Sequence, residues 1–241
     1  MENIRLCVEI KNLTFGYKRR ERILSSLDMQ VPHNAIYGLL GSNGSGKSTL
    51  FKLILHWHKA DTGTISYWGK QWRSPEIMYK IGSFVGDDSY YPHLTVRNHL
   101  ELLDVYFHKG KKRIEELLEY MNISYAADKK TGELSTGQRR RLSIALALFR
   151  DPELLILDEP FNGLDPMGVI ELRKLILDLH SEGKTIIISN HIISELNKIC
   201  THIGIIKAGT IVYQDKVSPN ADLEDIYIKA IRNDIAEPHQ I

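Results

Sequence analysis

Nine consecutive residues of this sequence have types and a spacing that suit a specific chemistry. The nine residues concerned are Gly41, Ser42, Asn43, Gly44, Ser45, Gly46, Lys47, Ser48 and Thr49. They fit the pattern G-x-x-x-x-G-K-[ST], in which glycines let backbone N–H groups approach an anion closely. In this pattern Lys47 reaches the β- and γ-phosphates, and the hydroxyl of Ser48 binds Mg²⁺. A chance Gly/Ser turn is disfavoured because the Lys-Ser pair and suitable flanking segments accompany the glycines.

Two neighbouring acids could supply a metal ligand and a base. Asp158 and Glu159 follow the aliphatic run Leu154 to Leu157, which is typical of a buried parallel strand. The carboxyl ends of such strands are where open α/β sheets bind ligands. Asp158 would hold Mg²⁺ through its water shell, and Glu159 could polarise a water that attacks the γ-phosphate. A plain strand end is a weak alternative, because buried acids without partners are costly.

Further polar groups are candidates for the same phosphates. Ser135, Gly137 and Gln138 open an arginine-rich helix, where a hydroxyl and free N–H groups suit phosphate, although alone they indicate only a helix cap. His191 follows the buried strand Thr185–Ser189 and could contact the γ-phosphate or the attacking water. A lone histidine is usually structural, but the position of His191 at the carboxyl edge of a strand, near Glu159 in topology, favours a functional role.

Two candidates have strong structural alternatives. Gly16 predicts a turn that ends the first strand and exposes the aromatic residue after it, Tyr17. Tyr17 could stack on a base, although a lone tyrosine is more often a core or surface residue. Asp87 follows the predicted strand Ile81–Val85 and Gly86. It could meet a metal or a partner, and a solvated loop is an equally good interpretation.

The elements that must position these residues are predicted from apolar spacing. Residues 35–40 predict a buried strand before the phosphate loop, and 50–55 a helix after it. Residues 8–15, 23–31 and 64–68 predict a small antiparallel sheet. Residues 89–149 are mainly helical, with helices expected over 96–107, 112–121 and 139–148. Helix 167–180, strand 185–189 and a hairpin at Ala208-Gly209 follow, and from Ser218 onward we expect a peripheral tail.

Composition narrows the class of protein. The chain has 241 residues, 43% of them hydrophobic, which is enough for a sizeable core. Its formal net charge of +1 gives no reason to expect a nucleic-acid partner. Cys7 and Cys200 have no metal or redox spacing and suit a reducing cytosol. No window approaches the ~18 apolar residues needed to span a bilayer and no signal segment is apparent, so any membrane role is expected to come through a partner.

Together these motifs resemble the ATP-binding cassette (ABC) family, the nucleotide-binding subunits of ABC transporters, as far as about Lys216. The phosphate loop, residues 134–138, the Asp158-Glu159 pair, the loop Gly163-Leu164-Asp165 and His191 occur in the family's order. The resemblance implies an α/β fold: a P-loop NTPase core with a mainly parallel sheet, an N-terminal antiparallel β subdomain and an inserted α-helical subdomain. It implies one ABC domain over 1–241, with a core over 1–88 and 150–217, a helical subdomain over 89–149 and a tail over 218–241.

The resemblance also implies roles, cofactors and partners. ATP and Mg²⁺ would bind between two cassettes, with Tyr17 on the adenine, Ser48 and Asp158 on the metal, and Glu159 and His191 as catalytic residues. Ser135 and Gly137 would contact the γ-phosphate held by the opposite protomer, so a second cassette, identical or related, is expected. A separate transmembrane permease would hold the chain at the cytoplasmic face of the membrane.

One departure from the family pattern bears on these expectations. Where the family usually has a glutamine, this chain has Gly86 followed by Asp87, which leaves Asp87 as a possible replacement at the metal. This feature, the segment 90–95 and the run 162–166 resemble exporters of the bacitracin-resistance and lantibiotic self-protection group. The predicted cargo is therefore a peptide antibiotic or another amphipathic or hydrophobic compound.

Three other functions remain open on the sequence. DNA-associated cassettes carry a long coiled coil, whereas fewer than about 100 residues separate Lys47 from Leu134 and no long heptad run is present. Ribosome-associated cassettes generally come in pairs within one chain, and this chain has one. A regulatory cassette with weak hydrolysis is disfavoured by Glu159 and His191, although Gly86 keeps it open.

Overall fold

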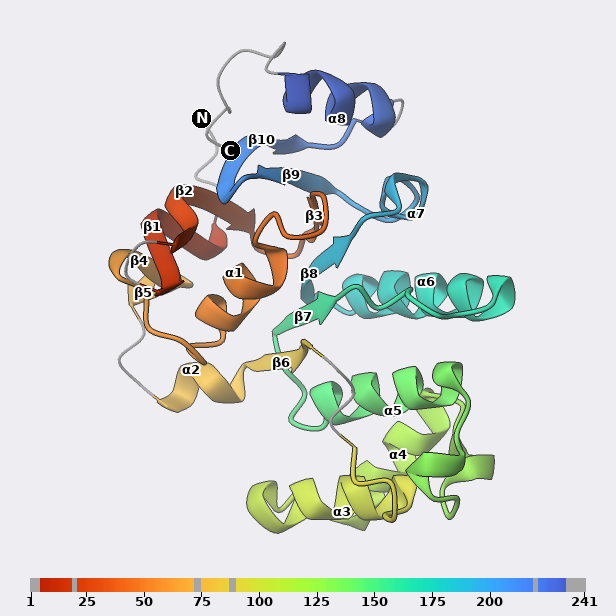
Figure 1. The fold of residues 1–241 in the computed structure, drawn as a ribbon. Coiled ribbons are helices and arrows are strands. Elements are labelled where there is room, and N and C mark those ends of the chain that lie inside the picture. Colours follow the sequence, from red (N-terminus) through yellow and green to blue (C-terminus); the bar gives the residue numbers. More distant parts are fainter. Residues whose placement is uncertain (1–4, 19–20, 72–74, 87–89, 219–220, 233–241) are drawn as a thin grey trace.

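The computed structural model describes residues 5–18, 21–71, 75–86, 90–218 and 221–232. Within these residues the chain forms a four-stranded and a six-stranded sheet, with a group of helices gathered at one edge of the larger sheet (Figure 1). The predicted α/β class, with an antiparallel N-terminal sheet, a mainly parallel sheet and a helical insertion, is confirmed.

The smaller sheet is antiparallel and has the order β2-β1-β4-β5. Its strands are β1 (Leu6–Lys18), β2 (Glu21–Pro32), β4 (Thr62–Tyr67) and β5 (Lys70–Gln71). A turn was predicted at Gly16, but β1 continues through this residue to Lys18, and Gly16 pairs with Arg22 of the neighbouring strand. A Cβ at Gly16 would collide with the carbonyl oxygen of Glu21, so the glycine permits close strand pairing rather than a turn.

The larger sheet has the order β10-β9-β3-β8-β7-β6 and is parallel except for β10. Its strands are β3 (Ile36–Leu40), β6 (Ile81–Phe84), β7 (Leu154–Asp158), β8 (Thr185–Asn190), β9 (His202–Lys207) and β10 (Thr210–Lys216). Strand β8 lies between β3 and β7 and is parallel to both. The carboxyl ends of these three strands therefore lie at the same edge of the sheet. This strand order brings the phosphate loop, the acid pair and His191 to the same side of the molecule.

The helices fall into two groups (Figure 1). Those beside the sheets are α1 (Lys47–Ile54), α2 (Pro75–Tyr79), α6 (Pro166–Ser181), α7 (Ile193–Asn197) and α8 (Leu223–Arg232). The inserted group comprises α3 (Val96–Phe107), α4 (Lys111–Tyr120), the 3₁₀ turns η1 (Ser124–Ala126) and η2 (Thr131–Glu133), and α5 (Thr136–Leu148). The inserted helices lie together beyond β6, apart from α1.

Alternating side chains of the parallel sheet enter two separate hydrophobic cores. Leu155 and Leu157 of β7 join the core that includes the inserted helices, whereas Leu154 and Ile156 join the core beneath the antiparallel sheet. Strand residues with period two point to opposite faces, so one aliphatic strand supports both layers. The central sheet is therefore the element to which both other parts of the molecule are attached.

The C-terminal segment, predicted as a peripheral tail, contains helix α8. Helix α8 buries Leu223 and Ala230, which belong to the same core as the inserted helices and β9. In the described part of the chain, none of the helices has the length and apolar character required to cross a membrane.

Candidate nucleotide-binding and catalytic site

The phosphate loop is a tight turn between β3 and α1. Gly44 and Gly46 have φ values of 79° and 110°, which glycine adopts without strain, and Gly46 caps α1. A Cβ at Gly41 would lie 2.6 Å from the carbonyl oxygen of Ile206. The local backbone thus requires glycine at the positions that the sequence pattern supplies.

Lys47 is folded over this loop. Its side chain is 5% exposed, and its Nζ donates to the carbonyl oxygens of Gly41 at 2.8 Å and Ser42 at 3.2 Å. A buried ammonium group requires such partners because desolvation of a charge is costly. The positive charge is therefore held at the mouth of the loop, on the side where the strand ends meet.

The loop is chemically suited to a polyphosphate. The first backbone N–H groups of α1 have no acceptor within the helix, and the helix dipole adds positive potential there. The Ser45 hydroxyl is buried and has no partner among the described residues, and Ser48, in the first turn, is exposed. Free donors, a buried ammonium and an accessible hydroxyl form a cradle that fits phosphate oxygens and a hard cation.

Ser189 joins the two acids at the end of β7. Its hydroxyl donates to Asp158 Oδ1 at 2.5 Å and accepts the backbone N–H of Glu159 at 2.9 Å. Asp158 and Ser189 are paired in the β7–β8 register, and Ser189 is fully buried. Ser189 was not predicted as a site residue, although its position at the end of a buried strand, next to Asn190 and His191, was a signal for it.

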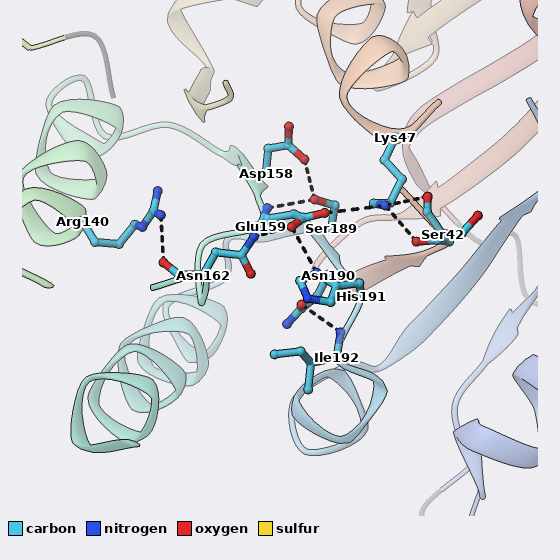
Figure 2. A network of polar contacts seen from close by, with 11 residues as sticks. Ser42, Lys47, Arg140, Asp158, Glu159, Asn162, Ser189, Asn190, His191 and Ile192 are labelled. Atoms are coloured by element: carbon cyan, nitrogen blue, oxygen red, sulfur yellow. Dashed lines mark hydrogen bonds and ion pairs between the residues drawn. The ribbon is translucent and has the colours of Figure 1, made fainter. Parts of the chain in front are cut away.

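The carboxylate of Glu159 meets groups from three other segments (Figure 2). Its Oε1 lies 3.6 Å from Lys47 Nζ, and its Oε2 lies 3.1 Å from His191 Nδ1. The side-chain amide of Asn162 donates to the same Oε2. Glu159 itself has φ 46°, an unfavourable left-handed conformation for a residue other than glycine. The backbone turn at the strand end thus directs this carboxylate toward the phosphate loop.

Asn162 also connects the acid to the inserted helices. Its carbonyl oxygen accepts a hydrogen bond from Arg140 Nη2 at 3.2 Å, as Figure 2 shows. Arg140 lies on α5, and its guanidinium is 4.4 Å from the ring centroid of Phe84 at the end of β6. Neither Asn162 nor Arg140 was predicted as a site residue, and the contact between them depends on how α5 packs against the sheet.

The residues at the start of α5 form a separate cluster. The Ser135 hydroxyl accepts the Gln138 backbone N–H at 3.3 Å, and Gln138 Oε1 accepts the Ser135 N–H at 2.9 Å. Gln138 Nε2 also donates to the hydroxyl of Tyr125 at 3.2 Å. These residues and Gly137 line a cavity of about 250 Å³ between α5 and α6. Figure 1 places α5 apart from α1, so the two phosphate-binding candidates form separate surfaces of one chain.

Tyr17 lies at the end of β1 and is 54% exposed. Its ring contacts Phe15 and His58 edge-on, with centroids 5.1 and 5.4 Å apart. The exposed ring is available to stack on another flat group. Asp87, the third candidate metal ligand, lies outside the described residues.

Comparison with known proteins agrees with this geometry. The family described as "ABC transporter" matches residues 24–162. The lantibiotic transport ATP-binding protein SrtF of Streptococcus pyogenes is 34% identical over 91% of this chain and 95% of its own length. The bacitracin transport ATP-binding protein BcrA of Bacillus licheniformis is 40% identical over 85% of this chain and 68% of its own.

A solved structure supports the same family. A dimeric ATP-binding cassette in a post-hydrolysis state, bound to ADP and Pi, has a TM-score of 0.79 and 26% identity, covering 88% of this chain and 99% of that one. The chain therefore belongs to the ABC transporter family. It is an ATP-binding and ATP-hydrolysing subunit of an ABC transporter, a class whose cassettes dimerise and pair with permeases.

Proposed function

We propose that this chain powers export of a peptide antibiotic, or of another amphipathic or hydrophobic compound, through a separate permease. In this proposal ATP binding closes a dimer of cassettes and hydrolysis reopens it. The names of two relatives support this class of cargo, because one is named for lantibiotic transport and the other for bacitracin transport. The permease would hold the chain at the cytoplasmic face of the cell membrane, with no nucleic acid as partner.

The observation that best supports the catalytic part is the convergence on Glu159. Lys47 and His191 come from different motifs, yet the Nζ of Lys47 and the Nδ1 of His191 both lie within 3.6 Å of the Glu159 carboxylate. In the proposed roles Lys47 and residues 41–49 bind the phosphates, Glu159 orients the attacking water or accepts its proton, and His191 orients Glu159 or the γ-phosphate. Phosphoryl transfer is catalysed mainly by such positioning and by charge stabilisation.

Ser48 and Asp158 are proposed to hold Mg²⁺, which when bound would neutralise charge on the phosphate oxygens. An exposed hydroxyl and a carboxylate fixed by Ser189 suit a cation that retains several waters. Asp87 stays a candidate for the same ion. Tyr17 is proposed to stack on the adenine.

Ser135, Gly137 and Gln138 are proposed to contact the nucleotide bound by the opposite cassette. Their separation from the phosphate loop within one chain supports this assignment, because two-fold symmetry can bring each surface to the partner's complementary one. The partner would be a second copy of this chain or a related cassette.

The first test is Mg²⁺-dependent ATP hydrolysis at increasing protein concentration, with the variant Glu159→Gln beside the natural chain. We expect activity to rise more steeply than linearly and to fall at least about 100-fold in Glu159→Gln, with ATP binding retained. Glu153→Gln is the matched control, because Glu153 precedes the same strand at its opposite end and pairs with Lys80. Equal turnover in Glu159→Gln and the natural chain would remove Glu159 from its proposed role.

The cargo is tested in cells. Deletion of the chain should increase sensitivity to bacitracin or to a lantibiotic, and the natural sequence, but not Glu159→Gln, should restore resistance. Unchanged sensitivity to both kinds of compound, in cells shown to express the chain, would contradict the proposed cargo class and leave its ATPase activity unaffected.

A further inference from the structure

Three aromatic rings pack together at the end of β1. The ring of Phe15 is buried and lies nearly parallel to that of His58, with centroids 5.5 Å apart and an interplanar angle of 18°. Tyr17 stands almost perpendicular to both, at 81° to Phe15 and 88° to His58. Tyr17 is therefore held by two rings at once while more than half of its surface remains exposed.

The segment that carries His58 is fixed at both ends. On the helix side, the N–H of Trp57 donates to the carbonyl of Lys52 in α1 at 2.8 Å. On the strand side, the N–H of Asp61 donates to the carbonyl of Thr14 at 2.9 Å, and its Oδ2 accepts the N–H of Gly16 at 3.2 Å. The same short segment thus connects the helix that begins in the phosphate loop with the strand end that carries Tyr17.

This arrangement restricts the orientation of an otherwise exposed side chain. A surface tyrosine ordinarily exchanges between rotamers, whereas edge-to-face ring contacts favour one of them. A ring that is already oriented loses less conformational entropy when a flat ligand stacks on it. A side chain that supplies such a ring contact can therefore strengthen binding of the ligand without touching it.

We propose that His58 is a positioning residue for base recognition, which holds Tyr17 in the orientation that stacks on the purine base of ATP. The proposal rests on the role proposed above for Tyr17. His58 acts through Tyr17 and not on the phosphates, so its contribution is confined to ligands that carry a base.

Calorimetric titration with ATP and with inorganic tripolyphosphate separates these two parts of the ligand. We expect His58→Ala to weaken ATP binding about three- to tenfold, the size of one aromatic pair, and to leave tripolyphosphate binding unchanged. In steady-state hydrolysis the KM for ATP should rise by a similar factor with kcat unchanged. His58→Phe retains a flat ring and should restore binding. Trp57→Ala is the control, because the neighbouring Trp57 is exposed and lies outside the three rings.

A double variant tests whether His58 acts through Tyr17. If it does, Tyr17→Ala combined with His58→Ala should bind ATP no more weakly than Tyr17→Ala alone, because residues acting as one unit are not additive. Additive losses would overturn the proposal, and so would equal weakening of ATP and tripolyphosphate by His58→Ala.

The same titrations distinguish the role of His58 from the role of Tyr17. Unchanged ATP affinity in His58→Ala, beside a weakened Tyr17→Ala, would refute the role of His58 alone. Unchanged ATP affinity in Tyr17→Ala would refute the base site itself.

Discussion

At the scale of single residues, one buried hydroxyl contacts both acids at the end of β7. Ser189 donates to Asp158 and accepts from the backbone of Glu159, so it fixes the proposed metal ligand and the proposed base with respect to each other. Each of its two hydrogen bonds joins β8 to the end of β7. A hydroxyl can serve both partners because it is donor and acceptor at once.

Ser189→Ala is expected to lower both stability and turnover. It leaves the Asp158 carboxylate and the Glu159 N–H without this partner in a buried place, which should cost about 1–3 kcal/mol of unfolding free energy. Because alignment of the acids matters in the transition state, kcat should fall about tenfold or more while ATP affinity changes little. Urea unfolding and steady-state kinetics measure the two effects.

The control for this variant is Ser181→Ala, which removes a hydroxyl from the exposed end of α6. It should change neither quantity appreciably. Normal turnover in a folded Ser189→Ala protein would show that the acids are aligned without this hydroxyl.

At the scale of elements, two helices of the inserted group begin with the same device. Thr95 caps α3 and Ser135 caps α5, and each forms a reciprocal capping box with the residue three positions later. Such caps satisfy N–H groups that have no acceptor within the helix. The two caps are chemically alike, but only Ser135 is also a proposed nucleotide contact.

Substitution of the two capping residues distinguishes the loss of a helix cap from the loss of a nucleotide contact. Thr95→Ala and Ser135→Ala should each lower the unfolding free energy by about 1 kcal/mol, the usual cost of losing a cap. Only Ser135→Ala should reduce ATP-dependent dimerisation in a Glu159→Gln background, as measured by size-exclusion chromatography with light scattering. Equal dimerisation in the two variants would contradict the proposed contact of Ser135 with the opposite nucleotide.

At the scale of the whole molecule, the two cores keep several titratable groups neutral. Burial raises the pKa of the Cys7 thiol from 9.0 to about 12 and also raises the pKa values of Cys200, Tyr37 and Tyr67 above their usual ranges. Three of these four residues belong to the core beneath the antiparallel sheet, and Cys200 belongs to the other. Folding therefore favours their protonated forms on both faces of the central sheet.

The raised pKa of Cys7 makes the unfolding free energy depend on pH. Below pH 9 the Cys7 thiol is protonated in both the folded and the unfolded chain, so its ionisation does not lower the unfolding free energy. Between pH 9 and about 12 the unfolded chain loses the proton while the folded chain retains it, so stability falls as pH rises. In this range Cys7→Ala should flatten the decline by up to about 1.4 kcal/mol per pH unit.

Urea unfolding under reducing conditions at pH 8 to 11 measures this effect. Cys7→Ala is expected to be less stable than the natural chain at pH 8, because it leaves a small cavity, and the difference should narrow with increasing pH. A constant difference across the range would contradict a raised pKa of Cys7.

Much of the fold was predictable from local sequence. The helix over 96–107 has the predicted bounds, and the α5 cap is the serine that the sequence indicated. Strand β7 continues one residue beyond its aliphatic run and ends at Asp158, because Glu159 has a left-handed backbone conformation. Strand β1 runs past Gly16, since close pairing with β2, and not a turn, explains that glycine.

The sequence by itself determined the phosphate loop, its flanking strand and helix, the acid pair and the family, because these depend on residue types at fixed local spacing. Only the tertiary structure decided that Ser189 and His191 meet the acids, that Arg140 meets Asn162 and that His58 meets Tyr17. Strand order and helix packing select those partners, and apolar periodicity specifies which face of an element is buried without specifying what it is buried against.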